Sequence, residues 1–205
     1  MKHSGLLFLA LTVIAPVIAW GGDGVVALQT AAASCADPTN SDRYIDCGNG
    51  TVTDNDTGLV WLADANCLNT TVSWFTAMEF VAGLSDKPAT SAAAAHDCGL
   101  ADGSSPGEWR LPSVEEWEAM VADAVALDCV FSGFGGPSIT DDSGTQCWQE
   151  GPGNSFSGVV SSFYWSASTF VVSPSNAWVV GLNFGSVSFV NKASGIFVWP
   201  VRGGQ

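Results

Sequence analysis

The sequence contains very little positive charge. Only six of its 205 residues are lysine or arginine, against 20 aspartates and glutamates, so the formal net charge is −14. Proteins that bind nucleic acids, heparin-like polyanions or anionic lipid surfaces need a basic surface that displaces counterions. The composition therefore argues against all three classes of partner.

Residues that build metal and catalytic sites are also scarce. The chain has two histidines, of which only His96 lies beyond the N-terminal apolar segment, and it has no Cys-x-x-Cys pair. A zinc site needs several such ligands at short spacing, so we expect the cysteines to bind no metal. With no other metal or cofactor pattern in the sequence, we expect no cofactor, apart from the calcium alternative considered below.

The N-terminus has the pattern of a secretory signal peptide. Lys2 precedes an apolar run over residues 5–19, and Val17 and Ala19 suit a cleavage site before Trp20. The run is short for a membrane-spanning helix, which needs about 20 residues, although a retained anchor or packing helix remains an alternative. We therefore expect a signal peptide at 1–19, a linker at 20–44 and a single domain at 45–205, in a secreted or cell-surface protein.

Six cysteines follow the signal peptide. An even number of cysteines in an exported chain predicts disulfides, and the sequence alone cannot choose among the 15 connectivities that six allow. Pairing between neighbours is our expectation, because each bridge would then enclose one loop-like insertion. The expected pairs are Cys35 with Cys47, Cys67 with Cys98, and Cys129 with Cys147.

Two helices are predicted between residues 73 and 126. Ser113 and Glu116 form a capping-box pattern after Pro112, and the apolar residues that follow recur at helical spacing, which predicts a helix over 113–126. Ser73 is the expected N-cap of a second helix that ends near residue 84. The predicted buried stripes are Trp74, Ala77, Met78, Val81 and Leu84 on one helix, and Trp117, Met120, Val121 and Ala124 on the other.

The remaining pattern is that of β-strands. Residues 51–53 and 59–62 flank a turn, which predicts a hairpin. In the second half, strands are predicted at 163–169, along the alternating segment 177–184, at 187–189 and at 196–202. The fold class predicted is therefore α+β, with two helices packed on a mainly antiparallel sheet.

The turn at Asp54-Asn55-Asp56 has two interpretations. Its hard oxygen ligands suit calcium. However, the 12-position calcium loop is incomplete, and Asp and Asn commonly stabilise turns by themselves. We expect a structural turn, with calcium as the alternative.

Four segments resemble a known family. They are residues 48–62, 108–117, 164–169 and 198–204, and together they resemble the C-terminal domain family of the Legionella collagen-like protein, a bacterial family of poorly defined function. The resemblance implies a C-type-lectin-like fold related to formylglycine-generating enzymes. It also implies that Trp61, Trp109, Trp117, Trp165 and Trp199 lie in the core, and that Arg110 and Arg202 hold the fold together.

The resemblance does not imply an activity, because one fold hosts many functions. No cysteine follows Cys147 to match the redox pair of the formylglycine-generating enzymes, so we expect no enzymatic activity. A non-catalytic, adhesin-like module that binds an extracellular glycan or protein is the leading hypothesis, and a self-associating subunit of a filament or surface layer is the alternative. The expected binding residues are Asn176, Trp178, Asn183, Ser186, Ser188, Asn191 and Lys192.

Overall fold

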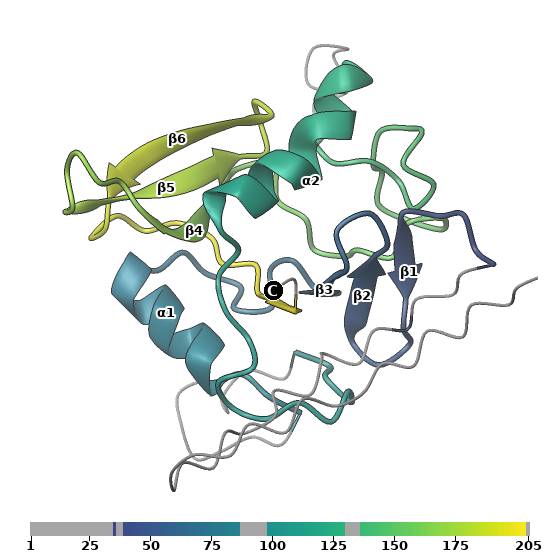
Figure 1. Ribbon diagram of the computed structural model, residues 1–205, viewed down its shortest axis with the longest axis horizontal. Helices are drawn as coiled ribbons and strands as arrows, with labels where there is room; N and C mark the ends of the chain where they lie inside the picture. The colour runs from purple at the N-terminus through teal and green to yellow at the C-terminus, as the bar shows by residue number, and fades with distance from the viewer. Residues whose placement is uncertain (1–34, 36–38, 87–97, 130–135, 204–205) are drawn as a thin grey trace, which may run out of the picture.

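The computed structural model describes residue 35 and residues 39–86, 98–129 and 136–203 (Figure 1). The predicted signal peptide, most of the predicted linker, and His96 lie outside these residues. The described part consists of two antiparallel sheets and two helices, so the predicted α+β class is confirmed.

The first sheet brings the beginning and the end of the domain together. Its strands are β1 (Tyr44–Asp46), β2 (Thr51–Asp54), β3 (Leu59–Leu62) and β7 (Val201–Gly203), in the order β1-β2-β3-β7. The predicted hairpin at 51–62 is confirmed by the pairing of β2 with β3. The last strand was predicted to begin at residue 196, which is wrong: it begins only after Pro200, which has no N–H to donate to a ladder.

The second sheet contains β4 (Phe163–Thr169), β5 (Asn176–Gly181) and β6 (Ser186–Asn191), in that order. β5 and β6 pair without interruption from Asn176 with Asn191 to Gly181 with Ser186. The predicted alternation to residue 184 is wrong, because the strand ends at Gly181. The carbonyl oxygen of Gly181 accepts hydrogen bonds from the amides of Phe184 and Gly185, and these close the turn.

Both helices begin at the predicted caps. Helix α1 (Trp74–Gly83) follows Ser73, whose side chain accepts from the Thr76 amide, and α2 (Val114–Ala126) follows Ser113. The capping box of α2 is confirmed, since Ser113 Oγ accepts from the Glu116 amide and Glu116 Oε2 accepts from the Ser113 amide at 2.7 Å. α2 crosses over the second sheet, while α1 lies below it (Figure 1).

The buried stripe of α2 is confirmed in full, but that of α1 is only partly right. In α1, the residues buried are Ala77, Phe80 and Val81, with Leu84 buried just after the helix. Trp74 and Met78 are only half-buried. Phe80 was missed, although Ala77, Phe80, Val81 and Leu84 recur at helical spacing. Trp74 lies against β4 instead, where its Nε1 donates to the Ser166 carbonyl oxygen at 2.9 Å.

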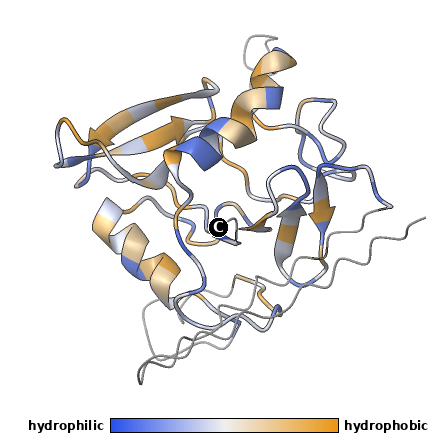
Figure 2. Cartoon of the chain, in the orientation of Figure 1, coloured by the Kyte–Doolittle hydropathy of each residue, from blue (hydrophilic) through white to orange (hydrophobic). Residues whose placement is uncertain are grey.

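The core is an aromatic cluster between the two sheets. Trp117 of α2 lies at its centre, with ring centroids 5.1 Å from Trp61, 5.9 Å from Trp199 and 5.9 Å from Tyr164. The indole N–H of Trp117 donates to the Trp165 carbonyl oxygen at 3.1 Å, so its polar atom is satisfied. Figure 2 shows hydrophobic residues on both helices and along β5, the elements that enclose this cluster.

Three arginines tie the segments of the fold together. Arg110 binds Glu116 through two nitrogens, at 2.7 and 2.6 Å, and also donates to the Gly203 carbonyl oxygen. Arg202 is buried and pairs with the buried Asp102 at 2.8 Å. Sequence reasoning missed Arg43, whose guanidinium joins Asp54 of β2 to Asp123 of α2.

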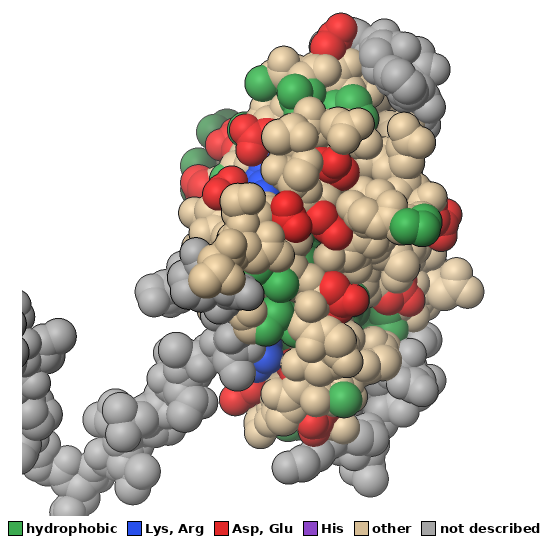
Figure 3. Space-filling view, turned by 90° about the vertical axis from the view of Figure 1, so that its right-hand side faces the viewer, with side chains coloured by type: hydrophobic (Ala, Val, Ile, Leu, Met, Phe, Trp, Pro, Cys, Tyr) green, Lys and Arg blue, Asp and Glu red, His purple; other side chains and the backbone are tan. Residues whose placement is uncertain are grey.

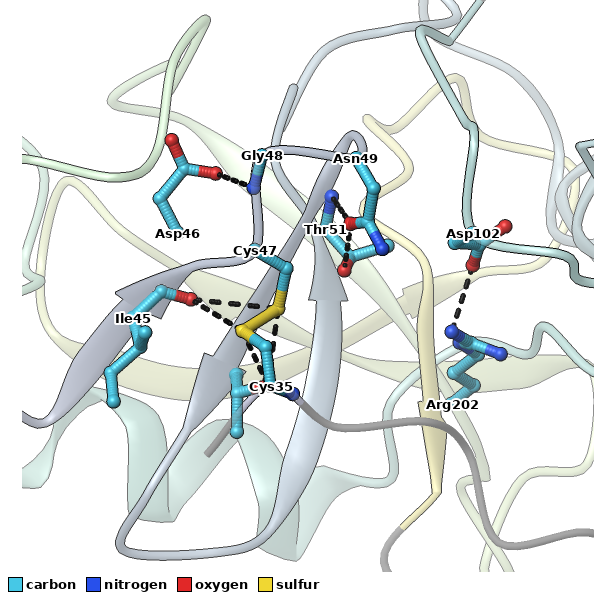
Figure 4. Close-up of a disulfide and its surroundings, with 10 residues drawn as sticks. Cys35, Ile45, Asp46, Cys47, Gly48, Asn49, Thr51, Asp102 and Arg202 are labelled. Carbon is cyan, nitrogen blue, oxygen red and sulfur yellow. Dashed lines mark hydrogen bonds and ion pairs between the residues drawn. A yellow bond between two sulfur atoms is a disulfide. The ribbon is translucent and has the colours of Figure 1, made fainter. Parts of the chain in front are cut away.

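The three expected disulfides are confirmed. Cys35 is bonded to Cys47, Cys67 to Cys98, and Cys129 to Cys147, across separations of 12, 31 and 18 residues. Figure 4 shows the first of them, with the ion pair of Asp102 and Arg202 in the same close-up. Each such bridge typically contributes about 2–4 kcal/mol, mainly by restricting the unfolded chain.

Because all six cysteines are bonded, a thiol-reactive label is expected to modify none of them in the folded, unreduced protein. Peptide mapping without reduction should recover the three linked pairs. A labelled cysteine, or a peptide that joins cysteines from two different pairs, would contradict this arrangement.

Candidate ligand-binding surface

Three aromatic side chains meet at one end of the second sheet. Phe170, which follows β4, stacks on Phe189 of β6 with ring centroids 4.0 Å apart and planes 7° apart. Trp178 of β5 lies edge-on to both, at 5.3 Å from Phe170 and 5.9 Å from Phe189. These three residues are called the aromatic patch below. None is fully buried, and Phe189 is 44% exposed.

The register of the sheet explains why these rings meet. Trp178 is directly opposite Phe189, and such cross-strand neighbours place their side chains on the same face. Phe170 is held over them by the six-residue turn that leads to β5, and its amide donates to the Asn176 carbonyl oxygen at 3.0 Å. The same turn exposes Val171 and Val172, at 82% and 81%. The patch therefore continues into an exposed apolar turn.

The structure brings some of the predicted binding residues together. Asn176 and Asn191 are cross-strand partners two positions from Trp178 and Phe189, so they share the face of the aromatic patch and flank it. Asn191 Oδ1 accepts from the Ala193 amide at 2.9 Å, which fixes the orientation of that side chain. Asn176, Trp178 and Asn191 therefore form one surface.

Other predicted binding residues lie elsewhere. Ser186 and Ser188 alternate with Val187 and Phe189 along β6, so their side chains lie on the opposite face. Asn183 belongs to the turn at the far end of β5. The sequence pattern alone could not separate these positions, because it does not say which face of a strand is accessible.

Lys192 lies next to the surface but is engaged by the fold. Its Nζ donates to Thr169 Oγ1 at 2.8 Å and lies 4.1 Å from the centre of the Trp74 ring. A cation over an aromatic face is attracted by the negative face of the ring. The ammonium group therefore links α1 to the second sheet.

Phe170 and Phe189 were missed as binding residues. The available signal was the charge distribution: every aspartate and glutamate of the chain precedes residue 151, so the whole second sheet lacks carboxylates. Burial also raises the pKa of the Tyr164 hydroxyl in β4 above its usual value, so this group stays neutral. By contrast, Figure 3 shows acidic side chains across the face on the side of β1 and β2.

The turn at Asp54–Asp56 is occupied by a cation of the protein itself. Arg43 Nη2 lies 3.3 Å from Asp54 Oδ2, and Arg43 Nε lies 3.6 Å from Asp56 Oδ2. Asp54 Oδ1 also accepts from the Asp56 amide at 3.0 Å, as expected for a structural turn. Within the described part of the chain, no group of three or more acidic, cysteine or histidine side chains is arranged to hold a metal ion.

One catalytic pattern does occur in the sequence. Residues 103–107 read Gly-x-Ser-x-Gly, with Ser105 at the position of a nucleophile. In hydrolases that motif forms a sharp turn between a strand and a helix. Here the segment is irregular on both sides, and the Ser105 amide donates to Glu108 Oε2 at 3.0 Å. The elbow geometry is therefore missing from this segment.

The fold and its surface define a class of protein. Two helices against antiparallel sheets, closed by the pairing of β3 with β7 and linked by three disulfides, are consistent with the C-type-lectin-like fold. The model of the Lcl C-terminal domain family matches residues 50–202, and the chain belongs to this family. No curated protein matches the sequence.

The structure also bears on the compartment. Disulfides form and persist mainly in oxidising environments outside the cytoplasm, and three are present here. Among the residues that the structure describes, no helix is long and apolar enough to cross a membrane.

Proposed function

We propose that this protein acts outside the cytoplasm as a non-catalytic binding module, with the aromatic patch as its binding surface. The observation that carries the proposal is the meeting of Phe170, Trp178 and Phe189, partly exposed, beside Asn176 and Asn191. Aromatic residues supply rigid contact area at low entropic cost, and asparagines supply adaptable hydrogen bonds. This combination suits recognition of a ligand that is apolar on one side and hydroxylated on the other.

The ligand class that fits is an uncharged glycan. The second sheet contains no carboxylate, and Lys192, which follows β6, is held by Thr169 and Trp74. A sulfated or phosphorylated ligand would meet the field of a protein with a net charge of −14 and no basic surface to balance it. A neutral sugar ring can place its C–H groups on the aromatic patch and its hydroxyls on the two asparagines.

The substitution Trp178→Ala is expected to weaken binding of a neutral glycan about thirtyfold, the effect of ~2 kcal/mol that is typical of a central aromatic contact. The measurement is a glycan array, followed by titration of the best neutral hit against both forms. Binding should change little between low and high salt, because no charge pair is screened.

Phe184→Ala is the matched control. Phe184 is an exposed aromatic residue of the same sheet, but it lies in the turn at the other end of β5. It should leave glycan affinity unchanged. The proposal would be overturned if the array gave only sulfated hits that salt abolishes, or if both variants lost affinity equally.

A further inference from the structure

Three of the four sheet edges are covered by other parts of the chain. At the β1 edge, the Tyr44 amide donates a hydrogen bond to the Asp142 carbonyl oxygen. At the β7 edge, Val201 and Arg110 exchange two backbone hydrogen bonds. The β4 edge is covered by Phe197, whose amide and carbonyl bond to Phe163 and Trp165. β6 is the fourth edge.

The outer edge of β6 is open in the part of the chain that the structure describes. Lys192 donates its amide to the Ser175 carbonyl oxygen, and hydrogen-bonded pairs alternate along an antiparallel ladder. The backbone groups of Ser186, Ser188 and Val190 therefore face β5, and those of Val187 and Phe189 point outward. No described residue bonds to these outward groups. Figure 1 shows β6 at the outer side of its sheet.

β6 has none of the features that protect an open edge. Natural edge strands are blunted by charged side chains, proline or bulges. The sequence of β6 is Ser-Val-Ser-Phe-Val-Asn, with no charge and no proline, and its six pairs with β5 continue without a bulge. It is an uninterrupted template for another strand.

The charge distribution favours a second copy of this chain as the source of the strand that pairs with β6. Two copies of a chain with a net charge of −14 repel each other over most approaches, but the segment from residue 151 onward contains no carboxylate. Strand β6 and the turns on either side of it therefore bring no carboxylate of their own to the contact. The edge strand is uncharged, and its outward backbone groups can pair with the same groups of an identical strand. A second copy of the chain can therefore bind this edge without a complementary charge.

We propose that β6 is a self-association edge, at which two copies of this chain pair β6 antiparallel about a two-fold axis through Ser188. In this register Val187 exchanges both backbone hydrogen bonds with the partner's Phe189, and the reverse holds by symmetry. A register centred on Phe189 would need the Asn191 carbonyl oxygen, which already accepts from the Ser194 amide at 2.9 Å. The Ser188 side chains of the two copies then lie opposite each other.

The association also has a consequence for the surface. Antiparallel pairing about an axis normal to the sheet keeps like faces together, so the aromatic patches of the two copies would lie on one side of a continuous sheet. Two linked sites bind a repeating ligand with greater avidity than one. This consequence depends on the proposed function, whereas the self-association itself does not.

The test is analytical ultracentrifugation of the disulfide-bonded protein over a wide range of concentration. The wild-type chain should form a concentration-dependent dimer. Ser188→Lys and Ser188→Asp should each abolish the dimer, because like charges would lie opposite across the axis, and an equimolar mixture of the two variants should restore it. Amide hydrogen exchange should show that Val187 and Phe189 become protected as the dimer forms.

Ser105→Lys is the control, since it makes the same charge change at an exposed position away from β6, and it should leave the dimer intact. Three outcomes would overturn the proposal: a wild-type chain that stays monomeric, a dimer that survives both Ser188 variants, or an edge that becomes protected only when an extended peptide of another protein is added. If the wild-type chain formed the dimer but bound no neutral glycan, that result would count against the proposed function and not against self-association.

Discussion

Trp117→Ala is expected to lower the free energy of unfolding by about 3–5 kcal/mol, as is usual when a buried tryptophan is truncated. Trp117 is completely buried and contacts Trp61, Trp199 and Tyr164. Its removal leaves a cavity where α2 meets both sheets. It also leaves the Trp165 carbonyl oxygen without the indole N–H that it accepts from.

Urea denaturation at constant pH, with the disulfides intact, measures this effect. The midpoint should fall with little change in slope. Phe75→Ala is the control, because that ring is 62% exposed on α1, and it should cost less than about 1 kcal/mol. If Trp117→Ala unfolded at the wild-type midpoint, the aromatic cluster would not be the core that stabilises the domain.

The second large effect is expected at the buried ion pair. Asp102→Ala should destabilise the domain by about 3–5 kcal/mol, because it leaves the Arg202 guanidinium buried without its carboxylate. Asp102 Oδ2 lies 2.8 Å from Arg202 Nη2, and both side chains are buried. Asp102 Oδ1 also orders the local loop by accepting from the Ser104 amide and hydroxyl.

Glu108→Ala is the informative comparison for this pair. Glu108 also faces Arg202, but at 3.7 Å and with a side chain that is 41% exposed, so its loss should cost less than about 1 kcal/mol. The double variant Asp102→Leu with Arg202→Met should recover much of the stability, since no charge is then left unpaired. If Asp102→Ala and Glu108→Ala lowered the free energy of unfolding equally, the guanidinium of Arg202 would be accessible to solvent.

The two proposals concern different atoms of the same sheet. The binding surface is formed by side chains on one face, Phe170, Trp178 and Phe189, whereas self-association uses the outward backbone groups of Val187 and Phe189. Ser188 lies on the opposite face from the patch, so its substitution leaves the patch residues in place. The two sets of variants can therefore be assayed independently, for dimerisation and for glycan affinity.

Local chemistry allowed much of the fold to be predicted from the sequence. The capping box of Ser113 and Glu116 fixes where α2 begins, whatever the rest of the chain does, and helical spacing selects Trp117 and Met120 as buried. Cysteines that bracket loop-like insertions indicated the disulfide pairs. The groups of the capping box are close in the sequence, so their pattern carries the information. The cysteines are 12 to 31 residues apart, so their pairing was one expectation among 15 until the structure confirmed it.

Tertiary contacts decided the rest. The position of the half-buried Trp74 involves a hydrogen bond to Ser166, which lies far along the chain. Arg43 gains its role only where β2 and α2 meet. The faces of β5 and β6 were equally undetermined, because alternation divides a strand into two sets without saying which set is covered.

The sequence by itself therefore determined the class of fold, the helix caps and the absence of acidic residues after residue 150. Only the tertiary structure decided that Trp178 meets Phe170 and Phe189, and that β6 alone of the four edges is open within the described residues. The physical reason is that local preference and hydrophobic pattern act over a few residues, whereas a surface is made by segments that long-range packing brings together.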